Sequence, residues 1–297
     1  MKNIFFFSFL FCYAASFSQT LYLDKVATVG KKTLIYKEIR EGKNLKLDFY
    51  NPKKIEGKRP LLLYVHGGGF SGGKRNSRLS VYFSNEMASH GYAVASISYR
   101  LTMQKLGFGC STKSASKIKA FNDASEDISY AIQYLIENSK SLNIDVDKII
   151  LVGSSAGAEA ILNLAYVYDN KILPKDFKFA GIIGMAGAIT TLRKINKKTA
   201  IPTQLFHGIS DSLVPYNIAP HHYCDKNSEG YLKLYGAKAI ANKLKSLNAS
   251  FYLYSVKNGN HTWSTRPLIS CRKEILDFLY YDVLKDGKRQ KETFVKS

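Results

Sequence analysis

The sequence predicts an α/β fold with a mostly parallel central sheet, helices on both of its faces and an antiparallel hairpin near the start. Strand-like and helix-like segments alternate over most of the 297 residues. Several strand candidates are continuous apolar runs, which is typical of parallel strands covered on both faces. The first two strand candidates have no helix between them, and this favours the antiparallel hairpin.

The expected strands are short β-leaning runs at 33–36, 45–50, 61–65, 93–99, 149–152, 179–185, 203–206 and 251–256. Helical patterns lie between them at 79–89, 121–139, 155–168, 236–247 and 268–284. In the second of these, Ile128, Ile132 and Leu135 recur at helical spacing. Two stretches fit neither pattern, so 102–119 is predicted to be a long loop and 214–235 a lid-like insertion. Loops of this length in a compact domain are usually functional or disordered.

The N-terminus has the pattern of a secretory signal peptide. Lys2 supplies the positive charge of a short first region, and six of the eight residues from Ile4 to Phe11 are Phe or Leu. Small residues follow, up to a cleavage site that we place after Ser18. The apolar run is shorter than the roughly 20 residues that a membrane span needs, and no later segment is long or apolar enough. We therefore expect a secreted or periplasmic protein whose single domain covers 19–297.

The formal net charge of +20 is the unusual feature of the composition. It has two interpretations, attraction to an anionic polymer or surface and plain lysine decoration of an exported protein. The sequence has no interleaving of aromatic and basic residues and no nucleic-acid-binding motif. We therefore favour decoration and expect no nucleic-acid partner. The sequence assigns no oligomeric state.

Three cysteines remain after the leader: Cys110, Cys224 and Cys271. An exported chain can form a disulfide, and an odd number of cysteines leaves one thiol over. Their spacing does not fix the connectivity. It also matches no zinc site, so we expect no bound metal.

The segment around Ser155 combines the features of a nucleophile on a sharp turn. Four apolar residues at 149–152 lead into Gly153-Ser154-Ser155-Ala156-Gly157, and a helical pattern follows. Such a turn holds the serine in a strained backbone conformation, and glycines two residues away on either side remove Cβ atoms that would collide. The helix that begins here directs its amides to the place where negative charge would develop. We predict that Ser155 is a catalytic nucleophile.

A glycine-rich loop follows the strand predicted at 61–65. Its sequence is His66-Gly67-Gly68-Gly69-Phe70, and three successive glycines allow backbone amides to crowd around one point. A phosphate-binding loop would need a Lys-Ser/Thr pair or a glycine at dinucleotide spacing, and neither is present. We therefore predict an oxyanion hole in which the amides of Gly68 and Gly69 join that of Ala156.

A serine hydroxyl needs an imidazole to take its proton and a carboxylate to orient that imidazole. Asp211 follows the strand predicted at 203–206, and His261 follows the one at 251–256. Catalytic groups collect in such loops at the carboxyl ends of parallel strands. We predict that Asp211 is the acid and His261 the base. The other candidates fit less well. His207 precedes the acid along the chain, and His66 is expected to pack the glycine-rich loop. No strand directly precedes the remaining four, which are His221, His222, Asp169 and Asp225.

Together these segments resemble the α/β-hydrolase superfamily, close to the hormone-sensitive-lipase-like carboxylesterases and the feruloyl or acetylxylan esterases. The resemblance rests on motifs spread over about 200 residues: His66–Phe70, Ser98–Leu101, Gly153–Gly157, Asp211 with Val214-Pro215, and His261. It implies the α/β-hydrolase fold and a cofactor-free, two-step acyl transfer. Ser155 would attack an ester carbonyl, His261 would relay the proton, and water would then release the acid. The expected substrates are small-molecule or polysaccharide-linked esters, such as acetyl or feruloyl esters.

The resemblance also implies roles for residues outside the catalytic set. Asp123 and Asp127, on the helix after Arg100, are expected to pair with that arginine. Glu159, one turn into the helix after the nucleophile, is expected to be a buried structural residue.

In this fold Cys110 and Cys224 both fall in loops over the rim of the active site, which favours a disulfide between them. Two departures from the family pattern leave the subfamily open. Ser98 stands where the lipase-like branch usually has Asp, and Ser210–Pro215 replaces its usual Asp-Pro-Leu near the acid.

Two other functions are compatible with this fold. A serine peptidase-like hydrolase can share it, but such exopeptidases usually carry a large N-terminal propeller domain, which this sequence does not include. A non-catalytic binding protein on the same fold typically lacks the serine, the histidine or an oxyanion glycine. All of these residues are present here.

Overall fold

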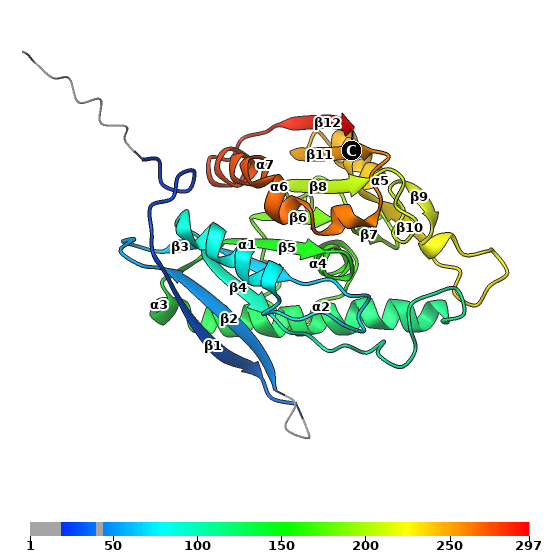
Figure 1. Cartoon of the computed structure of the whole chain (residues 1–297), viewed down its shortest axis with the longest axis horizontal. Coiled ribbons are helices and arrows are strands. Elements are labelled where there is room, and N and C mark those ends of the chain that lie inside the picture. Colours follow the sequence, from blue (N-terminus) through cyan, green and yellow to red (C-terminus); the bar gives the residue numbers. More distant parts are fainter. Residues whose placement is uncertain (1–18, 40–43, 297) are drawn as a thin grey trace, which may run out of the picture.

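The computed structural model describes residues 19–39 and 44–296, and the leader predicted at 1–18 lies outside the described residues. Its main feature is a nine-stranded sheet in the order β1-β2-β4-β3-β5-β6-β8-β11-β12 (Figure 1). Neighbouring strands from β4 to β12 run parallel, whereas β2 is antiparallel to both β1 and β4. The predicted α/β fold, with its mostly parallel sheet and antiparallel first hairpin, is confirmed.

The strands of this sheet are β1 (Val29–Lys37), β2 (Leu45–Pro52), β3 (Arg59–Val65), β4 (Ala93–Ile97), β5 (Ile144–Ser154), β6 (Gly181–Met185), β8 (Thr203–Gly208), β11 (Phe251–Lys257) and β12 (Gln290–Lys296). The central strands β3, β4, β6 and β8 are buried along their whole length, which explains their continuous apolar sequences. β1 is longer than predicted because only one of its residues is buried, so no apolar pattern marks where it begins.

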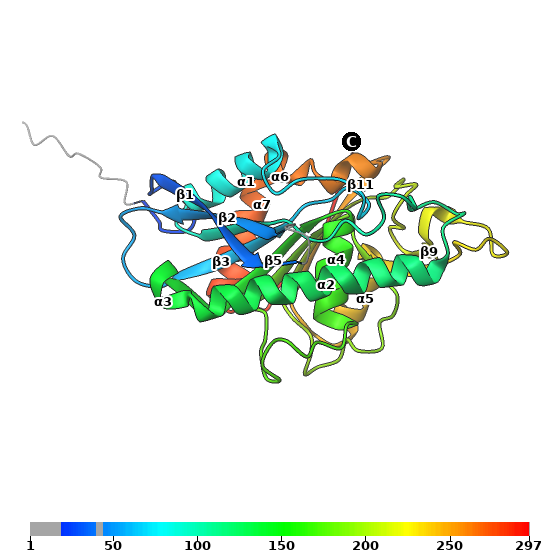
Figure 2. The same ribbon diagram turned by 90° about the horizontal axis from the view of Figure 1, so that it is seen from below.

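Helices cover both faces of the sheet, as predicted (Figure 2). On one face lie α2 (Ser114–Glu137), α4 (Ala156–Tyr166) and α5 (Ala237–Ser246), with the short α3 (Ser139–Leu142) after α2. On the other lie α1 (Arg78–Ser89), α6 (Pro267–Ser270) and α7 (Arg272–Asp277). Two apolar cores result, one with Phe121 and Ile128 of α2 and one with Phe83 and Met87 of α1. In the part of the chain that the structure describes, no helix combines the length and apolar character needed to cross a bilayer.

The prediction of a loop over 102–119 is wrong at its end, because α2 begins at Ser114. The first turns of this helix are held by the insertion, which follows about a hundred residues later in the chain. The N–H of Ser114 donates to the Glu229 carbonyl at 2.9 Å, and Nζ of Lys117 donates to the Gly230 carbonyl at 2.9 Å. These contacts are long-range, so the local Ser- and Lys-rich sequence does not reveal them.

The C-terminal part differs from the prediction in two ways. The helix expected at 268–284 is divided into α6, α7 and a π-helical segment, η3 (Phe278–Leu284). Residues 290–296 form β12, which pairs in parallel with β11 along the edge of the sheet. A polar edge strand has no continuous apolar run, so its pairing was missed.

The insertion at 214–235 contributes β9 and most of β10 to a second, three-stranded sheet in the order β7-β10-β9, and β7 comes from an earlier segment. Its strands are β7 (Ala188–Ile189), β9 (Ile218–Pro220) and β10 (Lys233–Gly236), and the helical turn η1 (His221–Tyr223) follows β9. A disulfide between Cys110 and Cys224 ties the insertion to the loop that precedes α2. This confirms the favoured cysteine pair, and Cys271 is a buried free thiol.

Candidate active site

The sheet topology brings Ser155, Asp211 and His261 to the same edge. Ser155 follows β5, Asp211 lies three residues after β8, and His261 begins the helical turn η2 (His261–Ser264) after β11. These strands are parallel and lie close together in the order β5-β6-β8-β11, so their carboxyl ends meet. The three side chains are therefore assembled from segments that are far apart in the sequence.

Ser155 has the strained backbone that the sequence predicts for it, with φ +50° and ψ −122°. The glycines on either side have no room for a side chain. A Cβ on Gly153 would lie 2.5 Å from the Gly157 carbonyl oxygen, and a Cβ on Gly157 would lie 2.1 Å from that of Val65. The turn thus packs β5, α4 and the end of β3 against one another, and this packing holds Ser155 in its conformation.

A continuous hydrogen-bonded chain links the three residues. Oγ of Ser155 lies 2.8 Å from Nε2 of His261, and Nδ1 of His261 lies 2.7 Å from Oδ2 of Asp211. With Asp211 ionised, Nδ1 carries the proton and donates a hydrogen bond to the carboxylate, which leaves Nε2 as the acceptor for the serine hydroxyl. In this state the imidazole is arranged to remove the proton of Ser155.

Asp211 is kept ionised by its surroundings. Its Oδ1 accepts hydrogen bonds from the N–H groups of Leu213 at 2.9 Å and Val214 at 3.1 Å. Burial alone would raise its pKa, but hydrogen bonds from His207 and His261 outweigh burial and hold the pKa of Asp211 well below its usual range. His207, set aside as a base, is thus a neighbour of the acid that the sequence did not reveal.

The glycine-rich loop lies directly against the turn of Ser155. A Cβ on Gly67 would come within 2.8 Å of the Ser154 carbonyl oxygen. Gly68 and Gly69 have φ values of +118° and +59°, and a Cβ on Gly68 would lie 2.5 Å from the Gly72 carbonyl oxygen. Among the described residues, the amides of Gly68, Gly69 and Ala156 donate no hydrogen bond to another protein group. They are free to receive an oxygen atom.

His66 packs this loop and makes no hydrogen bond to Ser155. Its ring stacks on Tyr99 with 4.6 Å between centroids, and its Nδ1 lies 2.8 Å from the Gly67 carbonyl oxygen. The hydroxyl of Tyr99 donates to the His66 carbonyl at 2.9 Å. Burial lowers the pKa of the His66 imidazole.

The arginine after β4 forms one of the two expected ion pairs. Nε of Arg100 donates to both carboxylate oxygens of the buried Asp127, at 3.0 and 2.8 Å. The expectation for Asp123 is wrong, because its carboxylate accepts from Lys119 at 2.7 Å and only its backbone carbonyl accepts from Arg100. One turn separates Asp123 from Asp127, and the guanidinium also pairs with Glu126. The Arg100 ion pairs join β4 to α2.

A cleft of about 470 Å³ opens in front of Ser155. It is lined by the glycine-rich loop, by Glu159 and by residues that follow or precede other elements, including Phe108, Leu213, His221, His222 and Thr265. His221 and His222 were expected to lie in the insertion, and they do, but they face this cleft. The competing carboxylates lie elsewhere, Asp225 on the exposed surface and Asp169 in a different cavity. The described residues contain no group of three or more His, Cys, Asp or Glu side chains arranged to hold a metal ion.

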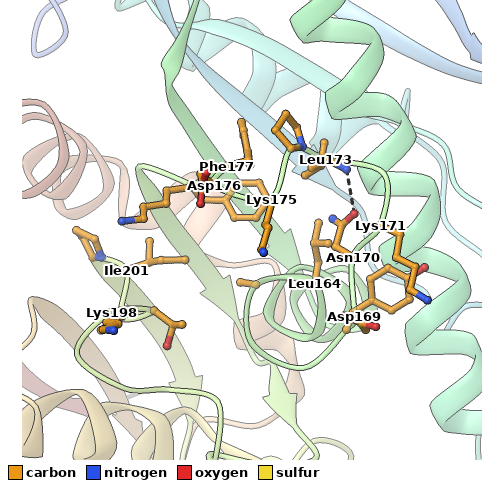
Figure 3. A pocket seen from close by; sticks show the side chains of 18 residues that line it. Leu164, Asp169, Asn170, Lys171, Leu173, Lys175, Asp176, Phe177, Lys198 and Ile201 are labelled. Atoms are coloured by element: carbon orange, nitrogen blue, oxygen red, sulfur yellow. Dashed lines mark hydrogen bonds between the residues drawn. The ribbon is translucent and has the colours of Figure 1, made fainter.

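A larger cavity, of about 720 Å³, lies at the opposite edge of the sheet (Figure 3). It is lined by the segments that precede β6 and β8 and by the end of α4, including Leu164, Phe177 and Ile201. The amino ends of β6 and β8 face this cavity, whereas Ser155 lies at the carboxyl ends of the strands. The length of the strands therefore separates the cavity from Ser155. Its labelled charges include Lys171, Lys175 and Asp176, and none of the residues of the hydrogen-bonded chain lines it.

Known proteins resemble this chain in sequence and in fold. The model of the BD-FAE family matches residues 47–184, a stretch that holds both the glycine-rich loop and the turn at Ser155. The chain has the α/β-hydrolase fold, and its matched stretch is similar to this family. The matched stretch of this α/β-hydrolase ends before Asp211 and His261, so their assignment depends on the strand order and the hydrogen bonds described above.

The curated relatives of this α/β-hydrolase include named esterases. Gut esterase 1 of Caenorhabditis briggsae is 27% identical over 164 residues, which cover 53% of this chain and 28% of that protein. The fumonisin B1 esterase of Sphingopyxis macrogoltabida is 30% identical over 122 residues, 39% of this chain and 22% of that protein. The similarity therefore spans less than a third of the length of these relatives.

Solved structures of esterase 2 from Thermogutta terrifontis share the fold over most of both chains. The butyrate-bound form has a TM-score of 0.60 at 18% identity and covers 87% of this chain and 95% of that chain. The propionate-bound form has a TM-score of 0.61 with the same identity and coverage. At this identity, the likeness establishes a common α/β-hydrolase fold.

Proposed function

We propose that this α/β-hydrolase is a serine esterase that cleaves carboxylic esters through an acyl-enzyme intermediate. Ser155 is the nucleophile, His261 is the general base, and Asp211 orients the base. The observation that carries this proposal is the hydrogen-bonded chain from Ser155 through His261 to Asp211, with distances of 2.8 and 2.7 Å. The names of the relatives, which include esterases, support an ester as the bond that is cut.

The geometry supports a two-step reaction. Oγ of Ser155 attacks the ester carbonyl carbon while its proton passes to Nε2 of His261, and Asp211 stabilises the resulting imidazolium. The tetrahedral intermediate then collapses, its C–O bond breaks, and His261 gives the proton to the departing alcohol. A water molecule attacks the acyl-enzyme with His261 again as base, which releases the carboxylic acid and restores the Ser155 hydroxyl.

The amides of Gly68, Gly69 and Ala156 would bind the negatively charged oxygen of both tetrahedral intermediates. Support comes from their unused N–H groups, from the close contact of Gly67 with the Ser155 turn, and from the position of Ala156 as the first residue of α4. One such donor contributes about 10²–10³ in rate. The positive φ of Gly68 and Gly69 is the backbone feature that points these amides to one place.

The proposed substrates are small-molecule esters or esters carried by a polysaccharide, such as acetyl or feruloyl groups. A cleft of about 470 Å³ lies in the lower part of the usual range for small-ligand sites, roughly 300–1,000 Å³. The leader pattern at 1–18 supports a secreted or periplasmic location, where polysaccharide esters would be encountered. In this proposal residues 19–297 form a single hydrolase domain, and the insertion at 214–235 shapes the rim of its cleft.

A fluorophosphonate probe and p-nitrophenyl acetate test the proposed function together. The wild-type protein is expected to be labelled and to release p-nitrophenol, and Ser155→Ala is expected to do neither. The adjacent variant Ser154→Ala is the matched control, because Ser154 is buried and its hydroxyl contacts that of Tyr64 at 3.3 Å rather than His261, and it should remain labelled. Absence of labelling and of ester turnover in the wild type would overturn the proposal. Much faster cleavage of an aminoacyl amide than of short esters would instead identify a peptidase-like hydrolase.

A further inference from the structure

Glu159 places a buried carboxyl group inside the proposed active-site cleft. It lies one turn after Ser155 on α4, and its N–H donates to the Ser155 carbonyl at 2.9 Å. Its side chain lines the cleft although the residue is only 2% exposed. The proposed acyl transfer does not require this carboxyl, because Asp211 already orients His261. Its position beside the nucleophile therefore needs a separate explanation.

The described part of the chain does not satisfy the hydrogen-bonding capacity of Glu159. Its Oε1 atom is buried and has no hydrogen-bond partner there. The imidazole of His221 lies beside it, with Nε2 3.5 Å from Oε1 and without a hydrogen bond between them, and Nδ1 of His221 is also unpaired among these residues. The buried Lys117 directs its ammonium group to the Gly230 carbonyl instead. Buried polar groups in native proteins are nearly always paired, so unpaired groups that face a cleft are available to bind a polar group of a substrate.

Burial favours the uncharged form of both side chains. Burial raises the pKa of Glu159 well above its usual range, and the negative charge of Asp211 raises it further against the opposing effect of Lys117. Burial lowers the pKa of His221 to about 2, and the nearby His222 adds to this effect. A protonated carboxyl and a neutral imidazole each offer one donor and at least one acceptor. Their natural complement is a neutral hydroxyl group, because a charged group would lose its hydration without gaining an opposite charge.

We propose that Glu159 and His221 are specificity-determining residues that bind a neutral hydroxyl group of the substrate beside the ester bond presented to Ser155. This inference rests on the proposed esterase function and narrows its substrates to esters with a hydroxyl close to the scissile carbonyl. The hydroxyl belongs to the acyl group or to the alcohol, and the two sources are separated by the experiment below.

His221 is held in place for such a role. Its N–H donates to the Leu232 carbonyl at 2.8 Å, which continues the pairing of β9 with β10. Its ring meets Phe108 edge-on with 4.9 Å between centroids. The disulfide at Cys224, three residues later, joins this part of the insertion to the loop that carries Phe108. A ring fixed by these contacts can discriminate between substrates, because it does not move away to hide an unpaired nitrogen.

The experiment compares two matched pairs of esters. For the alcohol side, the monoacetate of trans-cyclohexanediol is compared with cyclohexyl acetate, and for the acyl side methyl β-hydroxybutyrate is compared with methyl butyrate. The pair that shows a preference tells whether the hydroxyl belongs to the alcohol or to the acyl group. In that pair, the wild-type kcat/KM is expected to be at least about tenfold higher for the hydroxylated ester, because the other ester leaves Glu159 and His221 unpaired. In Glu159→Met this ratio is expected to fall to near one, and Glu159→Gln, which keeps a donor and an acceptor, is expected to retain most of it.

Three further measurements keep the outcomes distinct. His221→Phe preserves the aromatic contact with Phe108 and is expected to lower the same ratio, so the test does not depend on the folding of Glu159→Met. Glu137→Met, at an exposed position in the last turn of α2, is the matched control and should keep the wild-type ratio. No preference in either pair, or a preference that persists in both Glu159→Met and His221→Phe, would overturn the inference while leaving the esterase function intact. Failure of the esterase function itself would show as absence of fluorophosphonate labelling and of turnover of every ester.

Discussion

The buried imidazole of His207 lies 3.3 Å, Nε2 to Oδ2, from the same Asp211 oxygen atom that His261 contacts. The same nitrogen lies 3.1 Å from the carbonyl oxygen of Val214, so His207 bridges the carboxylate and the chain that folds around it. His207 is in β8 and is fully buried, whereas Asp211 is in the loop that follows. Asp211 is therefore held between two histidines, one of which contacts Ser155 and one of which does not.

His207→Phe is expected to lower kcat for p-nitrophenyl acetate by about tenfold, the usual effect of losing one hydrogen bond to a charged group. Hydrogen bonding from His207 lowers the pKa of Asp211, so its loss raises that pKa and moves the acid limb of the pH–rate profile to higher pH. His207→Gln, which keeps an N–H donor, should lie between the wild type and the Phe variant. A fall in kcat without any shift of the acid limb would show that His207 acts only through packing.

Gly68→Ala is expected to reduce kcat by about 10²–10³, equivalent to losing one oxyanion donor. The new Cβ would lie 2.5 Å from the Gly72 carbonyl oxygen at a φ of +118°, so the loop must shift and its amides lose their direction. Gly109→Ala is the control, because a Cβ there meets nothing within 4 Å and its φ is not in the left-handed region. Full activity of Gly68→Ala, measured at saturating substrate, would exclude this loop from the oxyanion hole.

Reduction of the Cys110–Cys224 disulfide is expected to destabilise the protein by about 2–4 kcal/mol and to raise KM more than it lowers kcat. The bond closes a loop with a sequence separation of 114 and fixes the insertion that carries His221 and His222 onto the cleft. Thermal unfolding and ester kinetics with and without reductant measure both effects. Cys271→Ala should respond to reductant like the wild type, because burial raises the pKa of Cys271 to about 11 and keeps it an unreactive thiol. An unchanged KM after reduction would show that the disulfide does not contribute to substrate binding.

Glu159→Gln is expected to stabilise the protein more at about pH 7 than at about pH 4. The carboxyl has a pKa near 4.5 in the unfolded chain and a raised pKa in the folded one. As pH increases above 4.5, the unfolded chain loses this proton while the folded chain keeps it, so the free energy of unfolding of the wild type falls. Glutamine does not titrate and removes this loss. Urea unfolding of both proteins at the two pH values measures the difference, and a difference that shrinks with pH would mean that Glu159 is ionised in the folded state.

The candidate site could be predicted from sequence to the extent that each residue lies in the segment that follows a strand. Ser155, Asp211 and His261 come after apolar runs, and parallel strands bring their carboxyl ends to one edge whatever their separation along the chain. The strained φ of Ser155 and the positive φ of Gly68 and Gly69 follow from the same local patterns. These features depend on short-range sequence, which is why no tertiary information was needed.

The features that were missed depend on contacts between distant segments. The start of α2 is held by the insertion, and β12 is defined by its pairing with β11 rather than by apolar periodicity. His207 was dismissed because it precedes the acid along the chain, although the turn after β8 folds Asp211 back onto it. The sequence predicts a structural role for Glu159. Only its place in the cleft beside His221 shows that its buried carboxyl has no hydrogen-bond partner among the described residues.

Part of the positive net charge lies on lysines of β1 and β12, the two outermost strands of the large sheet. Among the described residues, β1 pairs only with β2 and β12 only with β11, so each leaves one row of backbone groups unpaired. Exposed lysines stand on both strands, Lys31 and Lys32 on the first and Lys291 and Lys296 on the second. Docking the edge of another copy against either strand would bring ammonium groups together and strip them of water. Lysines that looked like decoration therefore oppose growth of the sheet from one molecule into the next.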